Sequence, residues 1–430
     1  MTGGVDYSNA VVVGADEQHV GADVLVGDFW QARPMLTHIR DFARSRMSGP
    51  WSTLGVVLAR AVASVPPTVQ LPATVGGAAS LNLFVALVGP SGAGKGASES
   101  AAREAVVFTN HWGQTMEVAE TPLGSGEGIA RTFRPAGTDE DAPNPIDRML
   151  FTVPEVDTLS SLIGRQGATL EGELRKLYSG EAIGFANAQR ATRSVVAAHS
   201  YRAALTLGVQ PLRAGALFAG ADGGTTQRFV WMDVRDPQAP DIPPDQPEPI
   251  TARLPRWQPD PLMIPEVASD AIRGHRLAQL RGENVDPLNG HALLCRLKVA
   301  AALMILDGRS IVSDEDWALA GQVMRYSDHT RTAIHQALTE HTAQANRARG
   351  IASVQREEAG ADYRRDRVCK TVLRVLGKHG PELSASDIRR RVKHTHRPYL
   401  EDAFADLTDT GAIHAIEVSA GTRYRLGDAA

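Results

Sequence analysis

Apolar runs and stretches of helical periodicity alternate along the first half of the chain. The runs at 81–88, 149–153, 203–209 and 228–234 predict strands that are buried on both faces. Apolar spacing of three and four residues predicts helix over 29–63 and, after a glycine-rich turn, over 97–112. A strand, a glycine loop and a helix in this order begin a βαβ unit, so the sequence predicts an α/β fold.

The second half is predicted to be mostly helical. Residues 237–265 include ten prolines, a density that indicates a linker or an extended wrapping segment. Helical periodicity returns over 291–307 and 314–345, with Ser313 or Asp314 as a candidate N-cap. The C-terminal pattern is typical of a winged helix: helices at 365–378, 384–392 and 396–410, then strands at 413–418 and 422–426.

The turn after the first apolar run fits G-x-x-x-x-G-K, the pattern of a phosphate-binding loop. Backbone N–H groups and a helix N-terminus bind the phosphates in such a loop, and its lysine reaches the β- and γ-phosphates. Lys95 is one of only six lysines, against 39 arginines, which favours a role over an incidental lysine in a glycine-rich turn. The predicted ATP site comprises Gly89, Ser91, Gly92, Ala93, Gly94, Lys95, Gly96 and Ala97. Gly96 stands where Ser or Thr usually ligates Mg²⁺, so either Ser98 or a water substitutes for that hydroxyl or metal binding is weaker.

Polar residues follow the later strands. We assign Glu155 to water activation or to Mg²⁺, with Asp157 as second choice; two acids at a strand exit without a catalytic role are the alternative. Gln210 is placed to sense a γ-phosphate. Arg228 is either an arginine finger acting across a subunit interface or an ordinary surface arginine.

The order of several motifs resembles the AAA+ module of MCM-like helicases: Lys95, Arg228-Phe229, Arg296-Leu-Lys-Val-Ala-Ala, and Val312-Ser-Asp-Glu-Asp316 with Ala320. Residues 29–345 look more closely like a primase-associated helicase-ATPase family of actinobacterial prophages, plasmids and integrative elements. The residues that carry this likeness are Ser80-Leu-Asn, Gly126-Glu-Gly, Pro154-Glu-Val-Asp, His199-Ser-Tyr-Arg, Gly208-Val-Gln-Pro and Gln227-Arg-Phe. The resemblance implies an AAA+-like core, a ring-forming (hexameric) motor, and Arg296 as a lid arginine that senses nucleotide. Gly96 and the non-contiguous acids Glu155 and Asp157 depart from the MCM pattern.

These patterns divide the chain into six parts. They are a loose tail (1–28), an N-terminal helical segment (29–75), a P-loop ATPase core (76–236), a proline-rich linker (237–265), a helical lid (266–350) and a winged helix (360–430).

Basic residues gather in two places. Arg389, Arg390, Arg391, Lys393 and Arg397 span the second and third helices of the predicted winged helix, and Arg423 and Arg425 lie on its wing. They predict DNA contact, with a solvated face or a protein-binding winged helix as the alternative. A predicted hairpin at 184–198 carries Arg190 and Arg193 at its tip, where it either grips one DNA strand in the pore of a ring or is an ordinary surface hairpin.

Composition narrows the function classes. A net charge of −4 excludes a uniformly basic nucleic-acid coat but not a local basic patch. Two cysteines, Cys295 and Cys369, exclude a disulfide framework, and they and the histidines, His199 among them, show no metal-ligand spacing. No apolar run is long enough to span a membrane and no signal peptide is indicated, so we expect a cytoplasmic protein.

Together these features favour an ATP- and Mg²⁺-dependent DNA helicase that acts in the replication of a mobile element or prophage. Single-stranded DNA, an origin duplex and a separate primase are the candidate partners. An ATP-switched, weakly hydrolysing initiator or regulator is the alternative. A metabolic kinase or small-molecule NTPase ranks last, because it would leave the winged helix unused.

Overall fold

The computed structural model describes residues 29–135, 144–163, 169–186, 194–219, 224–258, 260–284, 289–419 and 421–427. The chain divides into two compact units, Met1–Thr339 (the sheet unit) and Glu340–Ala430 (the C-terminal unit), and each is treated by itself. The predicted tail at 1–28 lies outside the described residues. None of the described helices is both long and apolar enough to cross a membrane.

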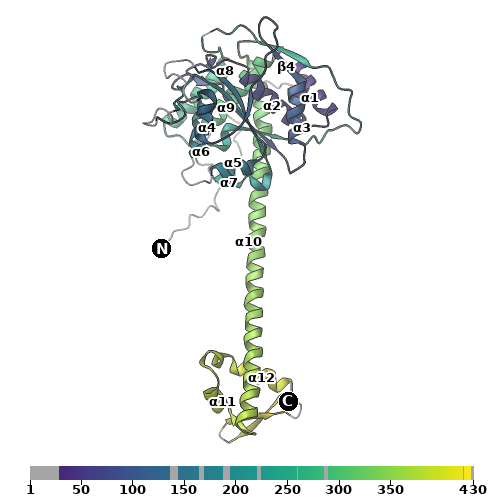
Figure 1. Cartoon of the computed structure of the whole chain (residues 1–430), viewed down its shortest axis with the longest axis vertical. Helices are drawn as coiled ribbons and strands as arrows, with labels where there is room; N and C mark the ends of the chain where they lie inside the picture. The colour runs from purple at the N-terminus through teal and green to yellow at the C-terminus, as the bar shows by residue number, and fades with distance from the viewer. Residues whose placement is uncertain are drawn as a thin grey trace. The chain divides into compact units, whose positions relative to one another are not determined.

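A five-stranded parallel sheet forms the centre of the sheet unit (Figure 1). Its order is β5-β6-β7-β3-β8, and every neighbouring pair is parallel. The strands are β3 (Leu83–Val88), β5 (Glu120–Pro122), β6 (Arg148–Val153), β7 (Arg202–Val209) and β8 (Phe229–Asp233). This arrangement confirms the α/β prediction and the four buried strands, because β3 and β7 are buried along their whole length.

Helices cover both faces of this sheet, because successive strand residues point to opposite sides. Leu83, Val85 and Leu87 belong to one apolar core, and Phe84 and Ala86 belong to the other. The first core is covered by α1 (Pro34–Ser45), α2 (Pro50–Ala63), α3 (Lys95–Ala105), α8 (Glu266–Leu280) and α9 (Asn289–Leu306). The second is covered by α4 (Gly126–Phe133), α5 (Val156–Ile163), α6 (Leu170–Ser179) and α7 (Gly215–Ala219).

The predicted helix over 97–112 is wrong in its second half. Helix α3 ends at Ala105, and the chain passes directly into β4 (Val106–Thr109), whose β-branched and aromatic residues favour a strand. Strand β4 pairs in parallel with β9 (Ile250–Arg253) from the proline-rich segment. That segment therefore wraps onto the sheet unit and contributes a strand. Shorter elements are η1 (Phe29–Gln31), β1 (Gln70–Leu71), β2 (Ala79–Ser80), η2 (Pro211–Arg213) and η4 (Thr226–Arg228).

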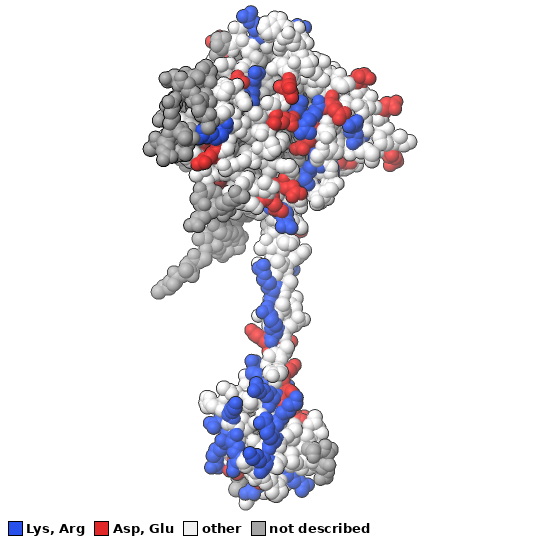
Figure 2. Space-filling model, viewed as in Figure 1, with Lys and Arg blue, Asp and Glu red and all other residues white. Residues whose placement is uncertain are grey.

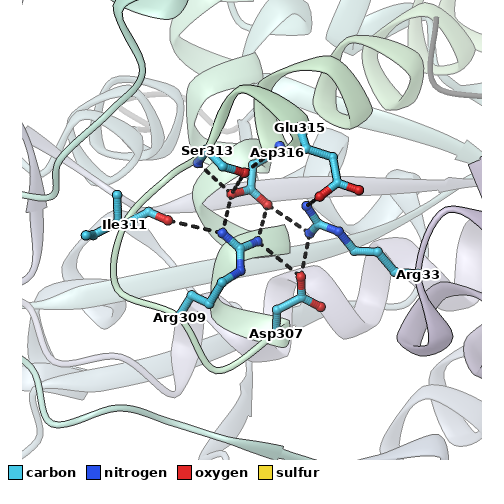
Figure 3. Close-up of polar contacts among 7 residues, drawn as sticks. All are labelled: Arg33, Asp307, Arg309, Ile311, Ser313, Glu315 and Asp316. Atoms are coloured by element: carbon cyan, nitrogen blue, oxygen red, sulfur yellow. Dashed lines mark hydrogen bonds and ion pairs between the residues drawn. The ribbon is translucent and has the colours of Figure 1, made fainter. Parts of the chain in front are cut away.

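A buried ion network ties the residue before α1 to the junction of α9 and α10 (Figure 3). Arg33 Nη1 lies 2.8 Å from both Asp307 and Asp316, and its Nη2 lies 2.9 Å from Glu315. Arg309 adds a second cation, 2.6 Å from Asp316. Burial would raise the pKa of Asp316, but the hydrogen bonds and charges of its partners outweigh burial and lower it. The network supplies the counter-charges that a fully buried carboxylate needs.

The predicted helices at 314–345 and 365–378 are one helix, α10 (Asp314–His379). Ser313 caps it, because the Asp316 N–H donates to Ser313 Oγ while Asp316 Oδ2 accepts from the Ser313 N–H. The two predicted helices are joined because 346–364 contains no proline and is rich in Ala, Arg and Glu. The boundary between the two units falls inside this helix.

The C-terminal unit has its own small core. The last turns of α10 supply Val368, Val372 and Leu376, which pack with Ile388 and Phe404. The other elements are β10 (Leu383–Ser384), α11 (Ala385–Arg391), η5 (His394–Tyr399), α12 (Leu400–Asp409), β11 (Ile413–Val418) and β12 (Gly421–Leu426). The strands form an antiparallel sheet in the order β10-β12-β11, so the predicted helices and strands are present in the predicted order.

Candidate functional site

The glycine loop joins the end of β3 to the start of α3. Gly92 and Gly94 have φ values of +76° and +92°, in the left-handed region that favours glycine. Gly94 is the residue directly before α3, so the loop uses a glycine at the point where the helix begins. A phosphate at this point would meet the N–H groups of the first turn of α3, where the helix dipole favours negative charge. Gly89 is buried at the strand end, Ala93 and Gly94 are half-buried, and Ser91, Gly92, Gly96 and Ala97 are exposed.

Lys95 lies between this loop and the ends of two neighbouring strands. Its Nζ donates to the carbonyls of Gly89 and Pro90, each at 2.9 Å. A Cβ added to Gly208 would lie 1.9 Å from the Pro154 carbonyl oxygen and 3.4 Å from Lys95 Cδ. Only a glycine therefore fits at position 208, where the loop, β6 and β7 meet.

Strand order brings three of the predicted site residues to one edge of the sheet. Strand β7 lies between β3 and β6, and all three are parallel, so their carboxyl ends share an edge. Gln210 follows β7 and is half-buried, and Glu155 follows β6 and is exposed. Burial lowers the pKa of Lys95, and the charge of Glu155 opposes part of that shift, as expected for close neighbours.

Two other carboxylates lie at the margin of this site. Asp157, in the first turn of α5, has a side chain that is 48% exposed and lies 3.9 Å from Arg213. Glu99, one helical turn beyond Lys95, was missed by the sequence analysis. It accepts a 3.5 Å hydrogen bond from Thr206 of β7, and burial raises its pKa. Nothing in the sequence distinguishes Glu99 from other helix-surface acids, because its position depends on how α3 packs on β7.

The side chain suited to bind a magnesium ion at this site is the Glu155 carboxylate, and neither Gly96 nor Ser98 offers the ion a hydroxyl. Gly96 has no side chain, and the alternative ligand Ser98 is wrong, since it is fully buried with its Oγ 2.8 Å from Ser52 Oγ of α2. Glu155 is exposed at the strand end and supplies the oxygen chemistry that Mg²⁺ prefers. One or two carboxylates together with nucleotide phosphates commonly hold Mg²⁺, so the single carboxylate of Glu155 supplies the smallest number of protein ligands that such a site uses.

Arg228 lies toward the opposite end of the sheet. It precedes Phe229, which pairs with Phe84 near the start of β3, whereas the phosphate loop follows Val88 at its end. At about 3.3 Å per residue, this stretch of strand spans roughly 13 Å. The guanidinium lies 3.4 Å from His291 and 6.0 Å from the centre of the Tyr178 ring. Arg228 is therefore out of reach of the loop in its own chain, and a finger role requires a second copy.

Arg296 packs inside the unit, against the first turns of α10. Its Nε and Nη2 donate to the Trp317 carbonyl at 3.1 and 2.9 Å, and its Cζ lies 4.0 Å from the centre of the Trp317 ring. Nucleotide sensing by Arg296 stays a prediction, and it would require this side chain to leave Trp317.

A buried polar network occupies the amino end of the sheet. Lys298 of α9 is fully buried, and its Nζ donates to the carbonyls of Asn82 at 2.8 Å and Tyr178 at 2.7 Å. The same Nζ lies 3.4 Å from the centre of the Tyr178 ring. Arg202, also fully buried, donates to Ser80 Oγ, Asn82 Oδ1 and the carbonyls of Val65, Pro66 and Val69. Asn82 thus joins both cations, and it also donates to the Leu177 carbonyl at 2.6 Å.

This network gives a structural role to motifs that carried the family resemblance. Burial lowers the pKa of Arg202 to about 9 and lowers the pKa of Lys298 far below its ordinary value. Both cations are held by carbonyl dipoles and amide oxygens in the contacts described above. The rarity of lysine in this chain was the available sequence signal for Lys298, as it was for Lys95.

The predicted nucleic-acid residues that belong to the C-terminal unit are exposed except for Arg397, which is half-buried. Arg389, Arg390 and Arg391 end α11, Lys393 directly precedes η5, and Arg397 lies in the last turn of η5. Arg423 and Arg425 alternate along β12 with Tyr424 and Leu426, which contact the core. Arg190 and Arg193 lie outside the described residues; the flanks of their segment meet at an antiparallel bridge between Ile183 and Val196. Among described residues, no three His, Cys, Asp or Glu side chains gather as a metal site.

Neither a protein-family model nor a curated protein sequence matches this chain.

Proposed function

We propose that this chain is a P-loop ATPase of AAA+-like architecture that drives a DNA helicase in the replication of a mobile element or prophage. The observation that carries the proposal is the meeting of Lys95, Gly208 and Pro154-Glu155 at one sheet edge, with Gln210 directly after the strand between. A phosphate-binding lysine, a polar sensor and a carboxylate in this order are the groups that phosphoryl transfer to water needs.

The residues take separate roles in this proposal. The N–H groups of the loop and Lys95 hold the β- and γ-phosphates, and Gln210 contacts the γ-phosphate. Glu155 orients the attacking water and accepts its proton. Mg²⁺, when bound with ATP, neutralises phosphate charge, and Glu155 is the residue that would hold it.

Assembly completes the site. Because Arg228 lies at the far end of β8 from its own loop, it would serve the loop of a neighbouring copy, which supports a ring, with a hexamer as the expected form. Arg296 would report nucleotide from the lid. The element order of the C-terminal unit supports a winged helix that contacts DNA in the cytoplasm, with a separate primase as a further partner.

An ATP-switched, weakly hydrolysing initiator or regulator is the second candidate. One observation favours it: the missing hydroxyl at Gly96 is not replaced by Ser98, whose Oγ is bonded to Ser52. A site with fewer ligands for the metal would bind nucleotide and turn it over slowly.

The test is steady-state ATP hydrolysis by the purified full-length chain, with and without single-stranded DNA. We expect DNA to stimulate hydrolysis and Lys95→Ala to abolish it. Arg273→Ala, at an exposed arginine of α8, is the control and should leave the rate unchanged. Binding of ATP with hydrolysis at background would favour the switch. Absence of ATP binding would overturn both candidates.

A further inference from the structure

The exposed side of α12 is acidic. Leu400, Ala403, Phe404 and Leu407 face the core. The exposed positions of the helix are Glu401, Asp402, Ala405, Thr408 and Asp409, which include three acids and no base. Acids in a first turn stabilise a helix N-terminus, but Asp409 stands in the last turn, where the helix dipole disfavours it. Helix stability therefore accounts for Glu401 and Asp402 but not for Asp409.

The elements around α12 are basic. Arg389, Arg390 and Arg391 end α11, and Lys393 follows, all of them exposed. Arg423 of β12 pairs with Ser384, the residue that caps α11, so the wing lies beside the start of that helix. Arg425 is the next exposed position along the wing.

A second basic row lies on the last turns of α10. Arg367, Lys370, Arg374 and Lys378 are exposed and are spaced by three and four residues, so they share one face of the helix. Figure 2 shows Lys and Arg gathered on the side of this unit that is turned to the viewer. Three of the six lysines in the chain, Lys370, Lys378 and Lys393, belong to these basic elements.

In three-helix domains that contain a helix-turn-helix, the third helix usually enters the major groove, where it reads base edges between two rows of phosphates. Here the successive turns of that helix would bring Glu401, Asp402 and Asp409 toward phosphate oxygens, and like charges at close range are repelled. The basic elements have the opposite preference. Arginine and lysine on phosphates give affinity and orientation without reading sequence.

We propose that the C-terminal unit binds duplex DNA by its phosphate backbone, through the end of α11, the wing and the α10 row, and that α12 stays out of the groove. The binding is independent of sequence. The proposal rests on the proposed function in one respect, that DNA is the partner, and it specifies how the partner is held.

The experiment measures fluorescence anisotropy of the full-length chain on two labelled duplexes of unrelated sequence over a series of salt concentrations. We expect equal affinities for the two duplexes and a linear fall of log affinity with log salt, with a slope of about −0.9 for each phosphate contacted. Arg389→Ala with Lys393→Ala should weaken binding about tenfold and make the slope shallower by about two.

The α12 variant is decisive. Glu401→Gln with Asp402→Asn should leave affinity unchanged or tighten it up to about fivefold, because repulsion is removed. Glu357→Gln with Glu358→Gln, an exposed acidic pair on α10, is the matched control for charge alone and should change affinity by less than twofold.

Three outcomes would overturn the inference: weaker binding in the Glu401/Asp402 variant, a tenfold preference for one duplex, or no binding to either duplex. The first two outcomes would mean that α12 reads bases, and they would not contradict the proposed function as a DNA-acting ATPase. A chain that binds both duplexes as expected but does not bind ATP would fail the proposed function while this inference stands.

Discussion

The two units of this chain differ in where their charged side chains lie and in what those side chains contact. Glu340–Ala430 has 16 Lys and Arg against 13 Asp and Glu, while the rest of the chain has 29 against 36. In the sheet unit, Arg33, Arg202 and Lys298 are buried among named partners. In the C-terminal unit the cations stand on exposed helix turns and strand positions. Buried charges with partners fix one packing arrangement, whereas exposed clusters attract a ligand of opposite charge.

The strongest test of this division is Glu155→Gln. We expect ATP hydrolysis to slow on the order of 100-fold or more, because an amide cannot accept the proton of the attacking water. Affinity for duplex DNA should stay within about twofold, since the proposed DNA surface belongs to the other unit. Hydrolysis and anisotropy assays on one preparation measure both. Asp157→Asn provides the comparison, and a larger loss there than in Glu155→Gln would reassign the base.

The next effect concerns stability of the sheet unit alone. Asn82→Ala removes the side-chain amide that joins Arg202, the Ala203 N–H and the Leu177 carbonyl of α6, so we expect the free energy of unfolding of this unit to fall by about 3 kcal/mol. Hydrogen exchange should show that amide protection is lost in β3 and β7 and is unchanged in Glu340–Ala430. Asn346→Ala, at an exposed asparagine of α10, is the control, with a change within about 0.5 kcal/mol. Equal loss of protection in both units would break the comparison.

Gly96 offers a gain-of-function test. A Cβ added there meets no atom within 4 Å, so both serine and alanine fit. We expect Gly96→Ser to raise the Mg²⁺-dependent hydrolysis rate about tenfold by restoring a hydroxyl ligand. Gly96→Ala adds the carbon atom without the hydroxyl, so it is the control for the added bulk. Its hydrolysis rate should stay near that of the parent protein. Equal rates for the two variants would show that the missing hydroxyl does not limit turnover.

The last prediction concerns the pH dependence of stability. The folded pKa of Lys298 lies below its unfolded value, so the unfolded chain binds the extra proton between the two values. Stability then rises with pH through this window, by at most about 1.4 kcal/mol per pH unit, and levels off above the unfolded pKa. Lys298→Met should remove this part of the slope, as measured by denaturant unfolding at several pH values up to about 10. An unchanged slope would mean that the buried lysine keeps its proton.

Local features of the fold were predictable from the sequence. Runs such as 203–209 indicate buried strands by themselves, and the glycine loop is a local pattern. The prediction failed where secondary structure depends on a distant pairing partner. Val106–Thr109 is a strand because β9 pairs with it, and β9 follows more than 140 residues later in the chain. The long α10 was missed because polar, exposed turns without apolar periodicity look like a linker.

The same holds for the candidate site, whose residues were predictable locally while the contacts between distant segments were not. Lys95 and Glu155 were predictable as residues at strand ends, but their convergence depends on strand order, which the sequence does not specify. Ser98 illustrates the limit most clearly. Its spacing from Lys95 suggested a metal ligand, but its direction is set by Ser52, a residue of a different helix. The buried network of Asn82, Arg202 and Lys298 likewise assembles from three distant segments.

The ion network of Figure 3 has a consequence for biosynthesis. Arg33 is synthesised well before its partner Glu315, which follows it by 282 residues. At about 5–20 residues per second, synthesis of that interval takes roughly 15–55 s. During that time α1 can collapse onto the growing core only with an unneutralised guanidinium beside it. We therefore expect stalled chains that end before residue 316, which lack these carboxylates or part of them, to be more sensitive to protease than the full chain.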